Sequence, residues 1–233
     1  MSPGIRNWFR SRTVDRVRDP VGRLQADLQG YDVTAFATEF NVARLDVIAS
    51  APMLMSRAER LMLFSLAFGL RPRCYLEIGT FQGGSALIVA AALDALESDA
   101  RMYCVDPAPQ IAPAHWAQLQ QRVQLFEATS PEIIPTVAAA AGMPFDMALI
   151  DGDHSYKGAI RDAEAVLPYM SHGSYVIFHD GFFVEVRRAI DDFVGAHPDQ
   201  LVDFGLLTRE ITIEQRPKGG PLQWGGLRVV YVR

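Results

Sequence analysis

Short apolar runs alternate with helical patterns through the middle of the chain. Five runs are typical of strands, at residues 74–79, 102–106, 123–127, 147–151 and 175–180. After each of them the pattern changes to that of a helix, at 84–98, 113–121, 130–141, 156–169 and 184–196. Strands that are apolar throughout and separated by helices indicate a parallel sheet with helices on both faces.

Two further patterns flank this alternation. Residues 56–70 predict a helix that Ser56 caps, and Glu59, three residues later, completes a capping box. Near the end of the chain, residues 204–214 and 227–232 are strand-like, with a turn rich in glycine and proline between them. No helix fits there, so we expect these two strands to pair antiparallel at one edge of the sheet. The fold class is therefore α/β, with five parallel units closed by an antiparallel pair.

Residues 1–50 differ in composition from the rest of the chain. Their first half is rich in arginine, at Arg6, Arg10, Arg12, Arg16, Arg18 and Arg23. A basic amphipathic start can rest on an anionic membrane or on a partner, whereas a solvated tail or a short packed helix is the simpler interpretation. We expect residues 1–50 to be an extension of helix and loop, acting as a lid or an oligomer arm. Residues 51–233 would be the main domain.

Composition and charge narrow the class of protein. Of the 233 residues, 49% are hydrophobic, which allows a sizeable core, and the net charge of -5 argues against nucleic-acid binding. Cys74 and Cys104 fall in predicted strands and are expected to be small core side chains. The opening residues lack the apolar segment of a signal peptide, and the longest apolar run, 86–93, is too short to cross a bilayer. We expect a cytoplasmic protein with no transmembrane segment.

The turn after the first strand carries the first chemical signal. Gly79, Gly83 and Gly84 let the backbone adopt positive φ and let a ligand approach closely. The next helix would point free N–H groups at that ligand. Glu77 precedes the first glycine and Asp106 ends the next strand, which is the layout of a nucleotide-type cofactor site. A carboxylate beside the turn suits an amine-bearing or cationic ligand better than a pyrophosphate.

A second polar group follows the fourth and fifth strands. Asp151, Asp153 and His154 leave one strand, and His179 and Asp180 leave the other. Because neighbouring parallel strands end at the same edge, Asp151 and Asp180 are expected to face one another. Two such carboxylates repel unless a proton or a cation lies between them. His154 has an ordinary pKa near neutrality and is the obvious general base, with Asp153 as its rival.

Each of these residues also has a structural explanation. Glu77 can be the buried partner of an arginine such as Arg73, and Asp106 can cap a helix. His179 can be a core histidine, with Asp180 capping the next segment, and His154 can lie on the surface.

Three segments resemble a known family. They are E-I-G-T-F-Q-G-G-S from Glu77, V-D-P around Asp106, and I-D-G-D-H-S-Y around Asp151. In this order they resemble class I S-adenosylmethionine-dependent methyltransferases. The subgroup is that of small-molecule O-methyltransferases acting on macrolide and aminocoumarin sugars, together with relatives known as cephalosporin hydroxylases. The resemblance spans about residues 51–233 and implies a Rossmann-like, doubly wound sheet of seven strands in the order 3-2-1-4-5-7-6.

The resemblance also implies roles for individual residues. S-adenosylmethionine would be the cofactor, with Asp106 on its ribose and with Thr129 and Ser130 near its adenine. The amino-acid part and its surroundings would be formed by Glu77, Gly79, Phe81, Gly83 and Ser85. A divalent metal, Mg or alternatively Mn or Fe, would be held by Asp151, His179 and Asp180. His179 stands where relatives have an acid, which would shift the preference away from Mg.

The expected activity is therefore metal-assisted O-methylation of a hydroxyl on a small polar molecule, such as a sugar or secondary metabolite. An oxygen- and iron-dependent hydroxylase on the same fold is an alternative. A second alternative is a non-catalytic, cofactor-binding partner subunit. A homo-oligomer is compatible with the sequence.

Overall fold

The computed structural model describes residues 45–216 and 220–233. These residues belong to one unit of the chain, Val33–Arg233. The arginine-rich segment and most of the predicted extension at 1–50 lie outside the described residues, so the prediction of a lid or oligomer arm stays a prediction.

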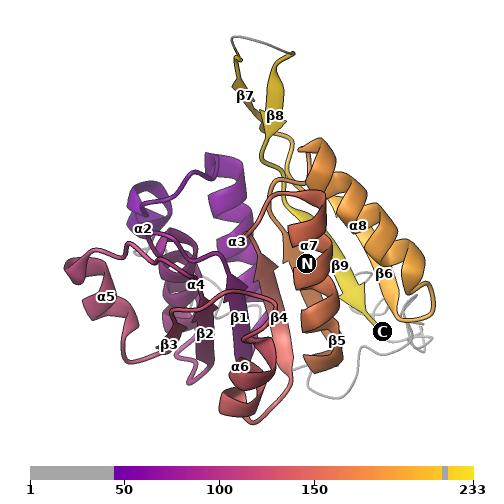
Figure 1. The fold of residues 1–233 in the computed structure, drawn as a ribbon. Helices are drawn as coiled ribbons and strands as arrows, with labels where there is room; N and C mark the ends of the chain where they lie inside the picture. Colours follow the sequence, from indigo (N-terminus) through magenta and orange to yellow (C-terminus); the bar gives the residue numbers. More distant parts are fainter. Residues whose placement is uncertain (1–44, 217–219) are drawn as a thin grey trace, which may run out of the picture. The chain divides into compact units, whose positions relative to one another are not determined.

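A sheet of seven strands organises this unit (Figure 1). Its order is β3-β2-β1-β4-β5-β9-β6; β1 to β5 are parallel, and β9 runs antiparallel to both of its neighbours, β5 and β6. Since β9 is the seventh strand of this sheet along the chain, the predicted order 3-2-1-4-5-7-6 is confirmed. The strands are β1 Cys74–Ile78, β2 Arg101–Val105, β3 Val123–Phe126, β4 Phe145–Ile150, β5 Met170–Phe178, β6 Leu201–Leu206 and β9 Arg228–Val232.

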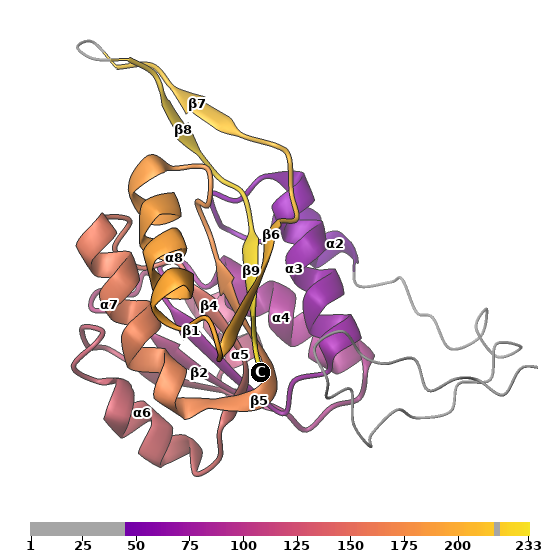
Figure 2. The same ribbon diagram turned by 90° about the vertical axis from the view of Figure 1, so that its right-hand side faces the viewer.

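Helices cover both faces of the sheet, as Figures 1 and 2 show. Apolar side chains of α2, α3, α4 and α5 form one core with one face of the strands. Those of α6, α7 and α8 pack on the other face. The bounds are α2 Leu45–Ser50, α3 Arg57–Leu70, α4 Gly84–Ala95, α5 Pro113–Leu119, α6 Ile134–Ala141, α7 Tyr156–Val166 with a 3-10 turn η1 Leu167–Tyr169, and α8 Val184–Ala196.

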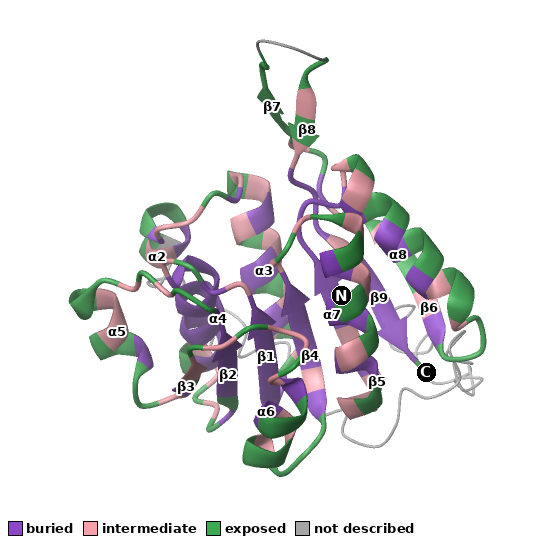
Figure 3. Cartoon of the chain, in the orientation of Figure 1, coloured by how far each residue is buried: buried purple, intermediate pink, exposed green. Residues whose placement is uncertain are grey.

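Burial follows this layering (Figure 3). Every residue of β1 is buried, as expected of a central parallel strand covered on both faces. Cys74 and Cys104 are free thiols with fully buried side chains, which confirms them as core residues. Within the described residues, no helix combines the length and the apolar character needed to cross a membrane.

Two predicted elements differ from those observed. The predicted strand 204–214 is divided into β6 and a separate β7 (Thr212–Glu214), which pairs only with β8 (Leu222–Trp224). Gly205, with a φ of 78°, lies beside an irregularity in the register near the end of β6, and the pairing of β6 with β9 ends at Leu206. The helix predicted at 130–141 begins only at Ile134, because the Ser130 hydroxyl bonds the Asp162 carboxylate in place of capping a helix.

Candidate active site

A cavity of about 460 Å³ opens at the carboxyl ends of β1, β2, β4 and β5. One part of its lining comes from the glycine-rich turn and the other from the loops after β4 and β5. Most of the sequence-predicted residues line it, namely Gly79, Phe81, Ser85, Asp106, Thr129, Ser130, Asp151, Asp153, His154, His179 and Asp180. Glu77 and Gly83 lie next to this lining and not in it.

The glycine-rich turn needs its glycines for steric reasons. Gly79 has a φ of 90°, and a Cβ at this position would lie 2.1 Å from the backbone oxygen of Asp151. Phe81 also has positive φ, and its N–H donates to the Asp106 carboxylate at 2.7 Å. The second carboxylate oxygen of Asp106 accepts from the N–H of Ala108 at 2.8 Å. Asp106 therefore holds the turn closed and still has lone pairs facing the cavity.

Glu77 is fully buried beside this turn. Its Oε2 accepts a hydrogen bond from the Tyr75 hydroxyl at 2.8 Å, and its Oε1 has no partner within the described residues. Burial raises the pKa of Glu77 to about 7, although the Tyr75 hydrogen bond opposes this shift. Arg73 pairs with Asp146, so the structural explanation of Glu77 as an arginine partner is not observed. A buried carboxylate oxygen without a partner fits an amine donor.

Asp162, on α7, is a site residue that the sequence did not predict. Its side chain is buried at the cavity, and its Oδ1 accepts from the Ser130 hydroxyl at 2.6 Å. Burial raises the pKa of Asp162 to about 6, although that hydrogen bond opposes the shift. A signal was present in the sequence, because Asp162 falls on the apolar stripe of the helix beside Ala159, Ala163 and Val166.

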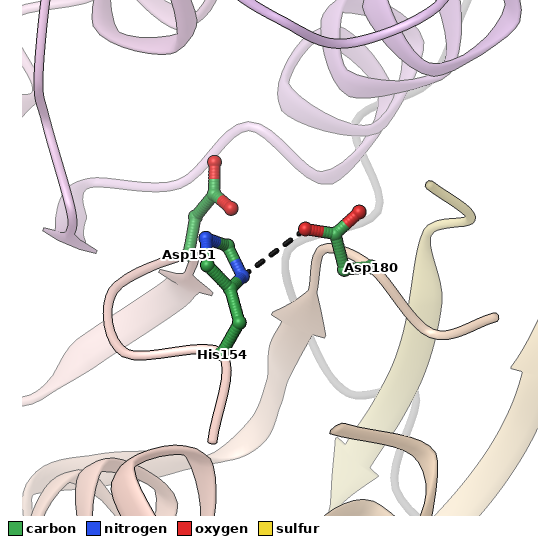
Figure 4. Close-up of side chains that lie close together, drawn as sticks. All are labelled: Asp151, His154 and Asp180. Atoms are coloured by element: carbon green, nitrogen blue, oxygen red, sulfur yellow. Dashed lines mark ion pairs between the residues drawn. The ribbon is translucent and has the colours of Figure 1, made fainter. Parts of the chain in front are cut away.

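His154 and Asp180 form an ion pair across the ends of β4 and β5 (Figure 4). His154 Nδ1 lies 3.1 Å from Asp180 Oδ2. The pKa of His154 is raised, chiefly by this hydrogen bond. Burial alone would raise the pKa of Asp180, but hydrogen bonds from His154 and His179 outweigh it and hold that pKa well below its usual range.

His179 lies buried among three carboxylates. Its Nδ1 is 2.8 Å from Asp151 Oδ1 and 3.4 Å from Asp180 Oδ2, and its Nε2 is 3.3 Å from Glu59 Oε1. Burial alone would lower the pKa of His179, but these carboxylates outweigh it and raise the pKa well above its usual value. Asp151 and Asp180 thus lie near one another, as predicted, and the ring of His179 lies beside both carboxylates.

Glu59 also lies at the site, although the sequence predicted only a structural role for it, in the capping box. The predicted capping box is present, since the N–H of Ser56 donates to Glu59 at 2.6 Å and the N–H of Glu59 donates to the Ser56 hydroxyl at 3.3 Å. The same carboxylate also accepts the N–H of Gly226 and faces His179. It therefore ties α3 to the loops that surround the cavity.

Asp153 does not join the group around Asp180. Its Oδ1 and Oδ2 accept hydrogen bonds from the N–H and the hydroxyl of Ser155, at 2.9 and 3.0 Å. The carboxylate is exposed and is used at the start of α7. This geometry favours His154 over Asp153 as the residue that faces a substrate hydroxyl.

A candidate set of metal ligands lies in the same place. Asp151, His154 and Asp180 each offer one ligand atom, and these three atoms lie within 4.8 Å of one another. Two carboxylate oxygens and a ring nitrogen suit a divalent cation in composition. The set differs from the predicted one, because His154 takes the place of His179. The Nδ1 of His179 is already engaged by Asp151.

Comparisons with known proteins agree with this architecture. Residues 76–181 match the family model Methyltransf_24, described as a methyltransferase domain. No curated protein sequence is similar enough to count as a match.

Solved structures share the fold over nearly the whole chain. Cofactor-bound Rv0187 from MTB is 21% identical, with 89% of this chain and 93% of that chain covered and a TM-score of 0.59. The O-methyltransferase TomG from Streptomyces achromogenes, in complex with SAM, is 18% identical, with coverages of 88% and 92% and a TM-score of 0.58. The O-methyltransferase from Bacillus cereus, in complex with SAH, is 19% identical, with coverages of 88% and 93% and a TM-score of 0.58.

At these identities the structures establish the fold, and the family match establishes the domain. The sheet order, the glycine-rich turn and the matched segment are consistent with one another. Residues 76–181 thus match a methyltransferase domain, and the chain has the fold of solved O-methyltransferases in complex with SAM or SAH.

Proposed function

We propose that this protein is a methyltransferase that transfers a methyl group from S-adenosylmethionine to a hydroxyl oxygen of a small polar molecule. The observation that carries the proposal is the His154–Asp180 pair at the cavity, opposite the glycine-rich turn along the sheet. A histidine held by a carboxylate is suited to accept a proton from a hydroxyl. Similar folds named as O-methyltransferases support the choice of oxygen.

The donor would bind at the glycine-rich turn. Its amine would donate to the unpartnered Oε1 of Glu77, and its carboxylate would lie at the start of α4, near Ser85. Asp106 would accept hydrogen bonds from the ribose hydroxyls, with Thr129 and Ser130 beside the adenine. Phe81, Gly79 and Gly83 would shape the turn around the donor. When bound, the donor supplies a methyl group that is already activated by the positive sulfur.

The acceptor would bind beside His154. Asp180 holds Nδ1 of the ring, which leaves Nε2 to take the proton of the acceptor hydroxyl. The acceptor oxygen then forms a bond to the methyl carbon, and the electron pair of the broken carbon–sulfur bond stays on sulfur. Asp180 stabilises the imidazolium that results. The protein's contribution is thus to orient one oxygen and to hold one proton.

A divalent cation is a second way in which the same side chains can act. Asp151, His154 and Asp180 would hold it, and His154 would then be a ligand and not a base. Mg or Mn would lower the pKa of an acceptor hydroxyl bound at this site, and Fe is an alternative cation. Dialysis against a strong chelator, followed by activity and metal-content measurements, separates the two forms. Full activity in metal-free protein supports the base, and loss with recovery on adding Mg or Mn supports the cation.

Replacement of the base tests the proposal directly. We expect His154→Ala to lower turnover by about 100-fold, the lower end of typical general-base effects. The dissociation constant of S-adenosylhomocysteine should stay within about twofold, because His154 lies outside the donor turn. His197→Ala is the matched control, since His197, the residue after α8, also pairs with a carboxylate, that of Glu164, but lies outside the cavity lining. An Asp153→Asn variant with the larger loss of turnover would reassign the base to Asp153.

Two other proposals remain from the sequence. The hydroxylase alternative predicts a hydroxylated product and no labelled methyl group in the product, and mass spectrometry distinguishes these outcomes. The partner-subunit alternative and the homo-oligomer rest on residues outside the described part of the chain. Deleting residues 1–25 and measuring both activity and molecular mass tests them.

A further inference from the structure

One aromatic side chain, Trp224, adjoins His154, and a second, Phe183, stacks on Trp224. Trp224, the last residue of β8, stacks on Phe183 with ring centroids 4.3 Å apart and planes at 19°. The ring of His154 stands nearly perpendicular to that of Trp224, at 5.8 Å and 80°. Trp224 and Phe183 are both half-buried, so part of each ring remains accessible. We call Phe183 and Trp224 the aromatic wall.

The backbone aligns this wall with the candidate base. The N–H of Gly225 donates to the Asp180 carboxylate, and the N–H of Phe182 donates to the oxygen of Gly225 at 2.9 Å. Across the hairpin, Nε1 of Trp224 donates to Glu214 at 2.8 Å. The segment that carries Trp224 is therefore bound to the same aspartate that orients His154.

The order of the strands places the wall on the acceptor side. The hairpin β7–β8 connects β6 to β9, and it stands beyond the sheet in Figures 1 and 2. The start of β9 pairs with the end of β5, so the hairpin leaves from the edge at which the parallel strands end. The glycine-rich turn follows β1, two strands away from β5 in the sheet.

The cavity beside the wall is acidic. Five aspartates line it, and among the described lining residues there is no lysine or arginine; the five are Asp106, Asp151, Asp153, Asp162 and Asp180. Glu59 and Glu77 are buried close to this lining. The two histidines in the lining are already paired with carboxylates. An anionic group on the acceptor would meet like charges in a poorly solvated space, which disfavours its binding.

We propose that the aromatic wall is the acceptor site and that it selects an uncharged ring molecule bearing hydroxyls. An aromatic or sugar ring packs against the accessible part of the stacked Trp224–Phe183 pair, and one hydroxyl of the ring reaches His154. The aspartates reject acceptors that carry a carboxylate or a phosphate. This assignment rests on the proposed O-methylation and adds the chemical class of the acceptor.

The first test compares variants of the hairpin in methyl transfer from isotopically labelled S-adenosylmethionine. Catechol and phenyl β-D-glucoside are the probes, one for an aromatic ring and one for a sugar ring. We expect Trp224→Ala to raise the KM of the accepted probe by about tenfold, with Trp224→Phe restoring most of the loss. The dissociation constant of S-adenosylhomocysteine should not change. Ile213→Ala, at an exposed residue one position along the partner strand, is the control and should keep the KM of the wild type.

The second test changes only the charge of the probe. Catechol is compared with 3,4-dihydroxybenzoate, and phenyl β-D-glucoside with phenyl β-D-glucuronide. We expect the uncharged member to have a kcat/KM higher by at least about tenfold. Equal or better transfer to the carboxylated member, transfer to neither uncharged probe, or an unchanged KM in Trp224→Ala overturns the acceptor assignment. If donor binding is intact, each of these outcomes refutes only the acceptor assignment and not the proposed methyl transfer. If the wild type does not bind the donor, the proposed function is refuted.

Discussion

The proposed contact of Glu77 with the donor amine connects its burial, its protonation and donor binding. Because burial raises its pKa to about 7, Glu77 is protonated in about half of the molecules at pH 7. A bound amine favours the ionised form and lowers this pKa, so donor binding should release about half a proton at pH 7. Calorimetry of S-adenosylhomocysteine binding in buffers of different ionisation enthalpy measures the release. Glu77→Gln should bind at least about tenfold more weakly and release less, and an unchanged release would contradict this role.

Asp162 gives a prediction about stability and pH. Its pKa is raised from 3.8 to about 6, so the folded protein binds this proton more tightly than the unfolded chain does. The stabilisation is therefore complete below pH 4 and lost as pH rises through about 6, by about 2–3 kcal/mol at most. As the pH rises over this range, we expect the free energy of unfolding of Asp162→Asn to increase relative to that of the wild type. Urea denaturation at pH 4.5 and 7.5 measures it, and an equal difference at both would refute a buried, titrating Asp162.

At this scale the sequence predicted the residues that belong to local motifs. Glu77 and Asp106 are recognisable because each lies at a fixed distance from a glycine turn or a strand end. Glu59 and Trp224 are not, because their roles depend on contacts with residues far away in the chain, such as His179 and Phe183. The sequence predicted His179 as a metal ligand, whereas the structure brings His154 to the candidate set. The reason is similar, since the ends of strands predict which residues lie near one another but not which ring nitrogen faces which carboxylate.

Among the elements, the glycine-rich turn makes the sharpest steric demand. Gly79→Ala combines positive φ with a Cβ at 2.1 Å from the Asp151 oxygen, whereas Gly142→Ala has positive φ in open space. We expect Gly142→Ala to lower the free energy of unfolding by about 1 kcal/mol, and Gly79→Ala by at least about 3 kcal/mol, because a backbone clash is added. Urea denaturation of both variants provides the comparison. Similar losses would show that the turn relaxes without cost.

The elements themselves were largely predictable, apart from those whose ends depend on tertiary contacts. The first four parallel strands were placed to within two residues because they are largely apolar, whereas the start of β5 was placed five residues too late because Ser171–Ser174 are polar or glycine. The start of α6 was placed too early, since the pattern of Ser130 and Pro131 does not reveal that Asp162 takes the hydroxyl. Strand β7 was merged into the predicted edge strand, and β8 was assigned to the turn after it, because alternation alone does not show where a strand leaves its sheet.

At the scale of the whole described unit, the sheet order accounts for the division of labour. The proposed donor residues lie at the ends of β1, β2 and β3, and the candidate base and the aromatic wall lie at or after the ends of β4, β5 and β8. Because β1 and β4 are neighbours, the two halves of the cavity meet between them. Ligand binding at the carboxyl ends of such a sheet, where the strand order reverses, is the general expectation for open α/β folds.

Binding of the methyl donor tests the central claim most directly. Isothermal titration calorimetry of the full chain should show that S-adenosylmethionine and S-adenosylhomocysteine both bind, with dissociation constants of about micromolar magnitude. Asp106→Ala should lose this binding, because it removes both the acceptor for the ribose hydroxyls and the two hydrogen bonds that close the turn. Asp99→Ala, at an exposed aspartate outside the cavity, should bind as the wild type does. Failure of the wild type to bind either molecule, or full binding by Asp106→Ala, would contradict the account.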